Sequence, residues 1–319
     1  MKTFIKDLKV GHSFDTQFLL VDFQLKNKRD GGKYLSLELM DKSGSLKGNM
    51  WDNFLGLVDV IQKNDVVAAS GVVQEYQGRT QVTISRMQRL DLEQVNLSDF
   101  VTSSKADIQA LWAQVKQRMD GMKTPALKDL LKAIFTDERV KKFLAAPAAK
   151  ALHNAYRGGL IEHVYSLLLM SEAAHAHYKA LGVDFNLELV QTGILLHDLM
   201  KTEELSYELS IDYTDVGHLI GHLPMALQLI ERHAAEISDF PSGLKLQLDH
   251  IVLSHHGELE YGSPVIPQTV EALVVSYLDQ LDSRMWGYQA LKDRKEASSN
   301  WTDSNRMFAT QLFVPNGSS

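Results

Sequence analysis

The sequence of 319 residues contains no cysteine, which excludes disulfides, thiolate metal ligands and cysteine nucleophiles together. No stretch approaches the roughly 18 consecutive apolar residues of a membrane span, and the first residues lack the apolar core of a signal peptide. The chain also lacks an excess of positive charge, because its net charge is -7, so bulk charge gives it little affinity for nucleic acid. We therefore expect a cytoplasmic protein with no membrane partner.

Charge and histidine are distributed unevenly along the chain. Residues 1–92 hold 13 Lys plus Arg against 11 Asp plus Glu, a net charge of +2, which leaves -9 for the remainder. Eleven of the 12 histidines lie between His153 and His256. Length and this asymmetry predict several domains. We expect a barrel domain over 1–92, a linker with bridging helices over 93–150, a helical domain over 151–290 and a C-terminal tail over 291–319.

The first of these domains shows short β-rich runs separated by clusters of turn residues, a pattern typical of a small β-barrel. The five runs cover residues 14–25, 34–40, 45–51, 66–76 and 80–90. The turn clusters include Asp30-Gly31-Gly32 and Gln77-Gly78. Five strands in a segment of this length fit an OB-fold.

OB-folds bind single-stranded nucleic acid by stacking bases on aromatic side chains in a basic groove. The predicted contacts are three aromatic and three basic residues: Tyr34, Trp51, Tyr76, Lys28, Arg29 and Lys33. Further candidates of the same kinds are Phe54, Lys26 and Lys47. The alternative is that most of these aromatic residues belong to the barrel core and that the basic residues form a solvated loop.

The remainder of the chain is predicted to be all-α. Polar residues dominate from Gln94 to Lys105, and periodic apolar residues then indicate helices around 108–115 and 127–135. From Gly158 to Met285 successive helical patterns follow, without a convincing pair of strands. Several of these helices carry a histidine or a carboxylate within an apolar pattern: His163, His197-Asp198, His222, His255-His256 and Asp279.

Histidines and carboxylates that project from different helices of a bundle can converge on one metal site. Imidazole with carboxylate, and without sulfur, suits divalent transition ions such as Mn, Fe, Co, Ni or Zn better than Mg alone. A pair of such ions would generate hydroxide near neutral pH and stabilise both the attacking and the leaving oxygen of a phosphodiester. The alternative for an isolated residue such as His163 or His222 is a hydrogen-bonded core histidine without a metal.

The order His163, His197-Asp198, Asp279 resembles the His…His-Asp…Asp signature of the HD metal-dependent phosphohydrolase superfamily. Lys201 is similar to the lysine that follows the aspartate in several branches of that superfamily. A longer resemblance, to the YhaM-type 3′-5′ exoribonucleases, is found in four segments: residues 158–163, Gly221-His222, His255-His256-Gly257-Glu258 and residues 261–264. Those enzymes also place an OB domain before an HD domain.

The resemblance implies a metal-dependent 3′-5′ exoribonuclease that hydrolyses single-stranded RNA, and to some extent single-stranded DNA, to 5′-mononucleotides by metal-activated hydroxide attack. It implies Mn²⁺ as the activating ion and two ions per site, with Asp198 and Lys201 as catalytic residues. The expected metal ligands are His163, His197, Asp198, His222, His255, His256 and Asp279, and Asp198 would bridge the two ions. One departure is Asn154, where the family pattern has a second histidine after His153, so a role for His153 stays open.

Two rival interpretations remain at this point. The first is an HD phosphohydrolase or phosphodiesterase that acts on a small nucleotide, with the OB domain serving as a protein contact. The second is a binding module whose metal site is purely structural. The sequence leaves open which of His255 and His256 is a ligand and what His218 does, and it is compatible with a homo-oligomer.

Overall fold

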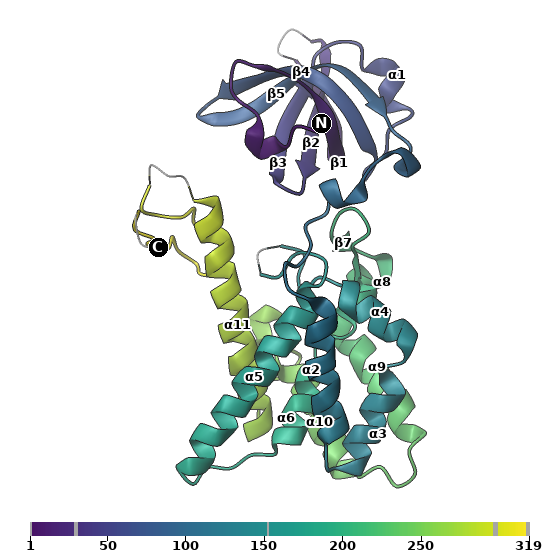
Figure 1. Cartoon of the computed structure of the whole chain (residues 1–319), viewed down its shortest axis with the longest axis vertical. Helices are drawn as coiled ribbons and strands as arrows, with labels where there is room; N and C mark the ends of the chain where they lie inside the picture. Colours follow the sequence, from purple (N-terminus) through teal and green to yellow (C-terminus); the bar gives the residue numbers. More distant parts are fainter. Residues whose placement is uncertain (1, 29–30, 152, 296–298, 317–319) are drawn as a thin grey trace. The chain divides into compact units, whose positions relative to one another are not determined.

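The computed structural model describes residues 2–28, 31–151, 153–295 and 299–316 (Figure 1). The chain divides into two compact units. One unit comprises Met1–Ser103 with Glu208–Ser210, and the other comprises Ser104–Tyr207 with Ile211–Ser319. None of the helices in the described part of the chain is both long and apolar enough to cross a membrane.

The first unit is a closed barrel of five strands in the order β1-β2-β3-β5-β4. The strands are β1 (Ser13–Asn27), β2 (Lys33–Asp41), β3 (Gly44–Met50), β4 (Val66–Tyr76) and β5 (Arg79–Arg89). Every neighbouring pair is antiparallel except β3 and β5, which run parallel. The predicted OB-type barrel is confirmed, and each strand lies within two residues of the run that predicted it.

Alternating side chains explain why these strands close into a barrel. Along β2, Leu35, Leu37 and Leu39 point into the apolar core, while the residues between them face outward. A register shift in β1 and another beside Gly71 in β4 bend the long strands. A Cβ atom on Gly71 would lie 2.1 Å from the carbonyl oxygen of Thr83, so only glycine fits where β4 crosses closest to β5.

Short helical segments complete this unit. They are one α-helical turn and three 3-10 turns: α1 (Leu55–Val58), η1 (Ile5–Asp7), η2 (Leu92–Gln94) and η3 (Leu97–Asp99). The helix α1 follows the β3 strand, and Phe54, just before it, is 6 % exposed and packs in the barrel core. Phe54 is therefore not available to stack on a base, and its place as a nucleic-acid candidate was wrong. Because Phe54 lies outside the strands, the alternation of apolar and polar residues along a strand could not predict its burial.

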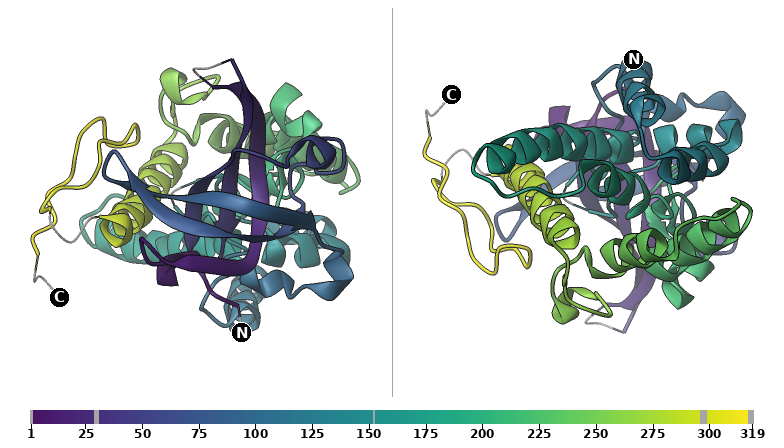
Figure 2. Two further views of the ribbon diagram at one scale, coloured as in Figure 1. Left: turned by 90° about the horizontal axis from the view of Figure 1, so that it is seen from above. Right: turned by 90° about the horizontal axis from the view of Figure 1, so that it is seen from below.

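The second unit is built from helices around one apolar core. Its longer helices are α2 (Ile108–Gly121), α3 (Pro125–Ile134), α4 (Asp137–Ala145), α5 (Gly159–Ala180), α6 (Leu187–Leu196), α9 (His222–Ala235), α10 (Ser242–Ser254) and α11 (Val270–Arg294). The helix α6 packs against α5, α10 and α11, and α5 packs along α11, as the view from below shows in Figure 2. The helices α2, α3 and α4, expected as a bridge between domains, contribute side chains to this same core.

The helical unit also contains smaller elements. These are α7 (Lys201–Glu204), α8 (Asp215–Leu219), η4 (Leu259–Tyr261) and a two-residue ladder of β6 (Leu205–Ser206) with β7 (Asp212–Tyr213). Two residues per strand are too few to produce an alternation that a sequence could reveal. The helices α8 and α9 are separated at Gly221, whose φ of 79° is in the left-handed region.

Candidate functional site

Three of the predicted ligand segments lie at helix ends. The helix α6 ends at Leu196, so His197 is its C-cap, and α10 ends at Ser254, so His255 is its C-cap. His222 is the first residue of α9, immediately after the left-handed Gly221. Adjacent residues inside a helix point about 100° apart, and His197 and His255 themselves still have helical backbone angles. Neighbouring side chains at these positions can therefore meet ligands on both flanks of a helix end.

A close contact between α6 and α10 holds two of these ends side by side. A Cβ atom on Gly193 would lie 2.6 Å from Cγ2 of Ile251, so the absence of a side chain there lets the helices approach. Gly193 lies one helical turn before His197, and Ile251 lies one turn before His255. The two imidazole rings pack edge to face with centroids 4.7 Å apart.

All seven predicted ligands come together in the interior of the helical unit. Three sets of side chains offer atoms within 4.8 Å of one another: His163, His197 and Asp279; His222, His255 and His256; and His197, Asp198 and His255. The first set joins α5, α11 and the end of α6, and the second joins α9 with the end of α10. The third set shares His197 with the first and His255 with the second, and Asp198 joins them.

Asp198 lies between the first and the second of these ligand sets, and its carboxylate oxygens face different histidines. We call the seven ligand residues together the cluster. Its Oδ2 is 3.4 Å from Nε2 of His197 and 3.9 Å from Nε2 of His163. Its Oδ1 is 3.5 Å from Nε2 of His222 and 3.6 Å from Nε2 of His255. One oxygen thus serves each side of the cluster, which is the arrangement of a carboxylate that can be shared by two cations.

Hydrogen bonds fix which ring nitrogen each histidine presents. Nδ1 of His197 and Nδ1 of His255 donate to the backbone carbonyls of Ile194 and Val252, both at 2.8 Å. Because a carbonyl only accepts, the hydrogen of each neutral ring is on Nδ1 and the lone pair of Nε2 faces the cluster. The helix ends therefore orient the ligand atoms as well as the side chains.

Two carboxylates do the same for the other two buried histidines. Nδ1 of His163 donates to Oδ2 of Asp282 at 2.7 Å, and Nδ1 of His222 donates to Oε1 of Glu204 at 2.8 Å. Ser166 donates to the second oxygen of Asp282. Carboxylates behind metal-ligating histidines fix their orientation and raise their basicity. Sequence reasoning missed both: Asp282 is one helical turn after Asp279, and Glu204 had no distinguishing signal.

The electrostatics of the cluster favour a bound cation. Burial acts to lower the pKa of His163, but hydrogen bonds with Asp279 and Asp282 raise it to about 9. Burial acts to raise the pKa of Asp198, but Lys201 and His197 hold it well below its usual range. The carboxylates of the cluster are therefore ionised at neutral pH and surround a point where positive charge is stabilised.

Several buried atoms of the cluster have no hydrogen-bond partner within the described residues. They are Nε2 of His197, His222 and His255, Nδ1 of His256 and Oδ1 of Asp198. Such atoms are costly unless something compensates them. Lone pairs of imidazole and carboxylate that converge in this way are the donor set of a divalent metal ion, so the residues present fit the metal.

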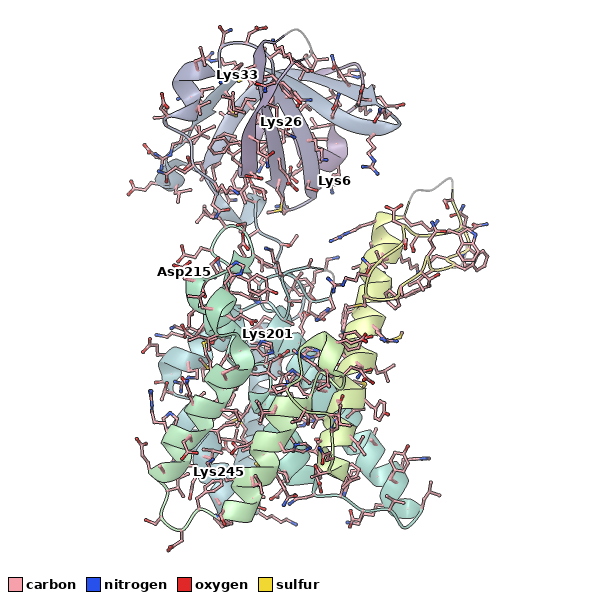
Figure 3. The ribbon with its side chains drawn as sticks, turned by 180° about the vertical axis from the view of Figure 1, so that it is seen from behind. Lys6, Lys26, Lys33, Lys201, Asp215 and Lys245 are labelled. Carbon is pink, nitrogen blue, oxygen red and sulfur yellow. The ribbon has the colours of Figure 1, made fainter. Side chains whose placement is uncertain are left out.

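Lys201, the predicted catalytic lysine, lies beside this cluster in the interior of the helical unit (Figure 3). Its Nζ donates to Oδ2 of Asp198 at 2.6 Å and to the carbonyl of Ala148 at 2.7 Å. Burial acts to lower the pKa of Lys201, but the charge and hydrogen bond of Asp198 raise it, so the side chain stays cationic. Two of its three hydrogens are used, and one remains for another acceptor.

The residues that the sequence left open are now placed. His153 lines a hollow beside the cluster, and burial lowers its pKa to about 4, so its ring is neutral. Burial likewise lowers the pKa of His256 to about 3. Asn154 is buried and donates to the hydroxyl of Tyr156. His218 is exposed and packs against Tyr213, and it belongs to none of the three ligand sets.

On the barrel, three of the predicted nucleic-acid residues lie together. The rings of Tyr34 and Trp51 stack with centroids 4.6 Å apart. Nζ of Lys28 is 5.5 Å from the centroid of the Trp51 ring and donates to the Trp51 carbonyl. Trp51 remains 40 % exposed, and Lys33 is exposed next to Tyr34 at the start of β2. Tyr34 and Lys33 belong to β2, and Trp51 follows the last residue of β3, so these side chains lie next to the face of strands 2 and 3 that OB-folds use for single strands.

Tyr76 lies on another part of the barrel, at the hairpin between β4 and β5. It is 58 % exposed and lines a hollow of about 670 Å³ together with Arg79 and Lys47. Lys47 was a candidate from the sequence, whereas Arg79 was not singled out. Arg29 lies outside the described residues.

The barrel and the cluster define a class of protein. The family model of the OB-fold nucleic acid binding domain matches residues 23–90, and that of the HD domain matches residues 160–284. The chain is thus an OB-fold protein with a divalent-metal HD domain. The 3′-5′ exoribonuclease YhaM of Bacillus subtilis (strain 168) is 32% identical over 279 residues, which cover 87% of each chain. The chain belongs to the YhaM family.

Solved structures also resemble part of the chain. The second OB-fold domain of replication protein A from Methanococcus maripaludis is 24% identical with a TM-score of 0.24, and covers 28% of this chain and 96% of that domain. A second structure of a domain of the same protein is 26% identical with a TM-score of 0.25, and covers 28% and 97%. TM-scores of this size support no conclusion about function.

Proposed function

We propose that this chain is a divalent-metal-dependent 3′-5′ exoribonuclease that releases 5′-mononucleotides from single-stranded RNA and also accepts single-stranded DNA. The observation that carries the proposal is the position of Asp198, whose two oxygens face two separate sets of ligand atoms. Membership of the YhaM family supports the activity, and the OB barrel supports a single-stranded nucleic acid as the substrate.

In this proposal the cluster would hold two Mn²⁺ ions, and Asp198 would contribute to both positions. One ligand set is His163, His197 and Asp279, and the other is His222, His255 and His256. Imidazole and carboxylate donors without sulfur are compatible with Mn²⁺, and also with Fe, Co or Ni. Two ions held here would supply Lewis-acid activation of water and would stabilise charge on the attacking and leaving oxygens of the phosphodiester.

Lys201 performs two tasks in this proposal. Its hydrogen bond to Oδ2 holds the Asp198 carboxylate in one orientation, so that each oxygen keeps its own side of the cluster. Its remaining N–H is free to donate to a non-bridging oxygen of the substrate phosphate in the hollow that Lys201 lines. The ammonium therefore both orients the shared ligand and stabilises negative charge on the phosphate.

The barrel holds the RNA upstream of the scissile bond in this proposal. Bases stack on the exposed Trp51 and on Tyr76, with Tyr34 supporting Trp51 from behind. Lys28 and Lys33, together with Arg29, attract the phosphates. We place the enzyme in the cytoplasm, where single-stranded RNA is available. We also propose that it can form a homo-oligomer, which light scattering would measure.

The experiment is degradation of a 5′-labelled single-stranded RNA with Mn²⁺ by the full chain. We expect a ladder that shortens from the 3′ end, 5′-mononucleotide products and loss of activity with a chelator. Asp198→Asn should be inactive, whereas Asp129→Asn, which changes an exposed aspartate on α3, should behave as wild type. Intact RNA with the wild-type enzyme, or full activity of Asp198→Asn, would show that the proposal is wrong. The same assay with a single-stranded DNA tests whether the enzyme also accepts deoxyribonucleotides.

A further inference from the structure

A hollow of about 500 Å³ opens beside the cluster of candidate metal ligands, within the helical unit. Lys201, His256 and Asp279 form its wall on the side of the cluster. Residues of the C-terminal segment, Asn305 and Arg306 among them, form another wall. The volume lies within the range of about 300–1,000 Å³ that is usual for small-molecule sites. This segment follows the residues 160–284 that match the HD domain, so no feature of that domain accounts for it.

The C-terminal segment has a defined structure over 299–316. It folds back on itself, with antiparallel bridges between Trp301 and Phe313 and between Asn305 and Thr310. The yellow segment lies alongside the C-terminal half of α11 in Figure 1 and in both views of Figure 2. We call residues 299–316 the C-terminal hairpin.

The tip of the C-terminal hairpin packs closely on α11. A Cβ atom on Gly287 would lie only 2.6 Å from Sδ of Met307, so the helix surface has no room for a side chain there. The side-chain oxygen of Asn305 accepts a hydrogen bond from the backbone N–H of Met307 at 2.8 Å and fixes the turn. Arg306 lies between these two residues. The hairpin therefore holds Arg306 at the hollow.

Two arginines line the hollow from different elements, Arg284 from α11 and Arg306 from the hairpin. Both are exposed, and within the described residues neither guanidinium has a hydrogen bond or an ion pair. Glu260 lines the same hollow but pairs with neither of them. A guanidinium offers five N–H donors in a planar fork that matches a phosphate. The chain as a whole is acidic, so attraction of an anion depends on local positive charges such as these two.

The position of the hollow indicates which phosphate the arginines would hold. In a 3′-5′ exonuclease the scissile phosphate lies at the metal cluster, and the terminal nucleoside carries no second phosphate. The nearest remaining phosphate belongs to the next linkage upstream, about one nucleotide away. An upstream phosphate is therefore the group of the substrate that a pair of arginines beside the cluster can bind.

We propose that Arg284 and the hairpin residue Arg306 form a subsite for the phosphate of the penultimate linkage of a single-stranded RNA. The inference rests on the proposed exoribonuclease activity and adds a specificity element to it. The subsite makes the enzyme favour substrates with at least two phosphodiester linkages. A dinucleotide with a 5′-hydroxyl has only the scissile phosphate and leaves the subsite empty.

The test compares a 5′-hydroxyl dinucleotide with the corresponding trinucleotide, in the full chain with Mn²⁺. Arg306→Gln and Arg284→Gln should each lower kcat/KM for the trinucleotide about tenfold, because each loses a charged hydrogen bond. The dinucleotide should be hydrolysed within about twofold of wild type, because it lacks the phosphate that these arginines bind. Each variant should also reduce the slope of log KM against log salt for the trinucleotide by about 0.7. Arg294→Gln, an exposed arginine of α11 that does not line the hollow, is the matched control.

The outcomes separate this inference from the proposed function. Equal losses on both substrates, or no loss on either, overturn the subsite while wild-type degradation of RNA leaves the proposed function intact. A wild-type enzyme that degrades no RNA overturns both. A 5′-phosphorylated dinucleotide adds a second measurement, because its 5′-phosphate should occupy the subsite and restore sensitivity to the arginine substitutions.

Discussion

Replacing Asp282 with asparagine should weaken one of the two metal positions and leave the other unchanged. The side chain is 5 % exposed and accepts the Nδ1 hydrogen of His163 at 2.7 Å, so water cannot replace it. Asparagine keeps the shape and one acceptor oxygen but removes the charge. His163 stays in place, while its Nε2 becomes a weaker donor to a metal ion.

The expected loss of metal affinity follows from replacing a charged hydrogen-bond acceptor by a neutral one. A hydrogen bond to a charged group contributes about 1.5–3 kcal/mol, and a neutral one contributes about 0.5–1.5 kcal/mol. The difference of about 1–1.5 kcal/mol corresponds to roughly tenfold in metal affinity. Substitutions behind metal ligands cost about 10- to 100-fold, so tenfold is the lower end of that range. Ser166→Ala, which keeps the Asp282 charge, should cost much less.

The assay is a calorimetric titration with Mn²⁺, combined with activity measured against Mn²⁺ concentration. Glu204→Gln is the counterpart on the other side, since Glu204 accepts from His222. Each single variant should weaken one class of site, the double variant should weaken both, and excess Mn²⁺ should restore most of the activity. The reasoning is refuted if Asp282→Asn binds Mn²⁺ within twofold of wild type, or if both variants weaken the same class.

Three further predictions concern packing, pH and RNA binding. Gly193→Ala should lower the free energy of unfolding by about 1–3 kcal/mol through overpacking against Ile251 and should also weaken Mn²⁺ binding, whereas Gly243→Ala, with no atom within 4 Å of its new Cβ, should do neither in urea unfolding and metal titration. Burial acts to raise the pKa of Glu188, but hydrogen bonds from the Thr124 side chain and from the backbone N–H groups of Lys123 and Thr124 lower it. Its stabilisation is thus present above the unfolded pKa of about 4.3 and is lost as pH falls through the lower folded value, so Glu188→Gln should cost about 1 kcal/mol at pH 7 and nothing in strong acid; a constant difference across urea melts from pH 7 to 2 would contradict this. Trp51→Ala should raise KM for a long RNA by about fivefold or more without changing dinucleotide hydrolysis, and equal effects on both substrates would contradict a role in stacking.

The barrel was predictable because its physics is local. Buried and more exposed side chains alternate over part of each strand, most regularly in β2, and turn residues mark most of the boundaries. Phe54 escaped this reasoning because it lies between β3 and α1, where no alternation indicates burial. The stacking of Tyr34 on Trp51 was equally hidden, since it depends on the antiparallel pairing of β2 with β3 across a turn.

The ligands of the cluster were predictable for a different reason. A histidine or aspartate in an apolar helical pattern is costly, so its presence indicates a compensating partner even before the partner is known. Asp282 and Glu204 gave no such signal, because carboxylates are common in helices and their role depends on which imidazole lies opposite. Arg306 was hidden in a polar tail whose packing on α11 depends on a contact with Gly287.

Sequence periodicity could not predict where the helices end, and the helix ends carry the side chains that meet in the cluster. A helix continuing through 197 and 198 would point the imidazole and the carboxylate about 100° apart, and only one of them could face a given ion. His197 still has helical backbone angles, yet both side chains reach the cluster, because its ligand atoms lie on both flanks of the end of α6, and Oδ2 of Asp198 lies 3.4 Å from Nε2 of His197. His255, at the end of α10, lies near the other oxygen, with its Nε2 3.6 Å from Oδ1 of Asp198. The ends of α6 and α10, held together where Gly193 meets Ile251, therefore place Asp198 between the two ligand sets.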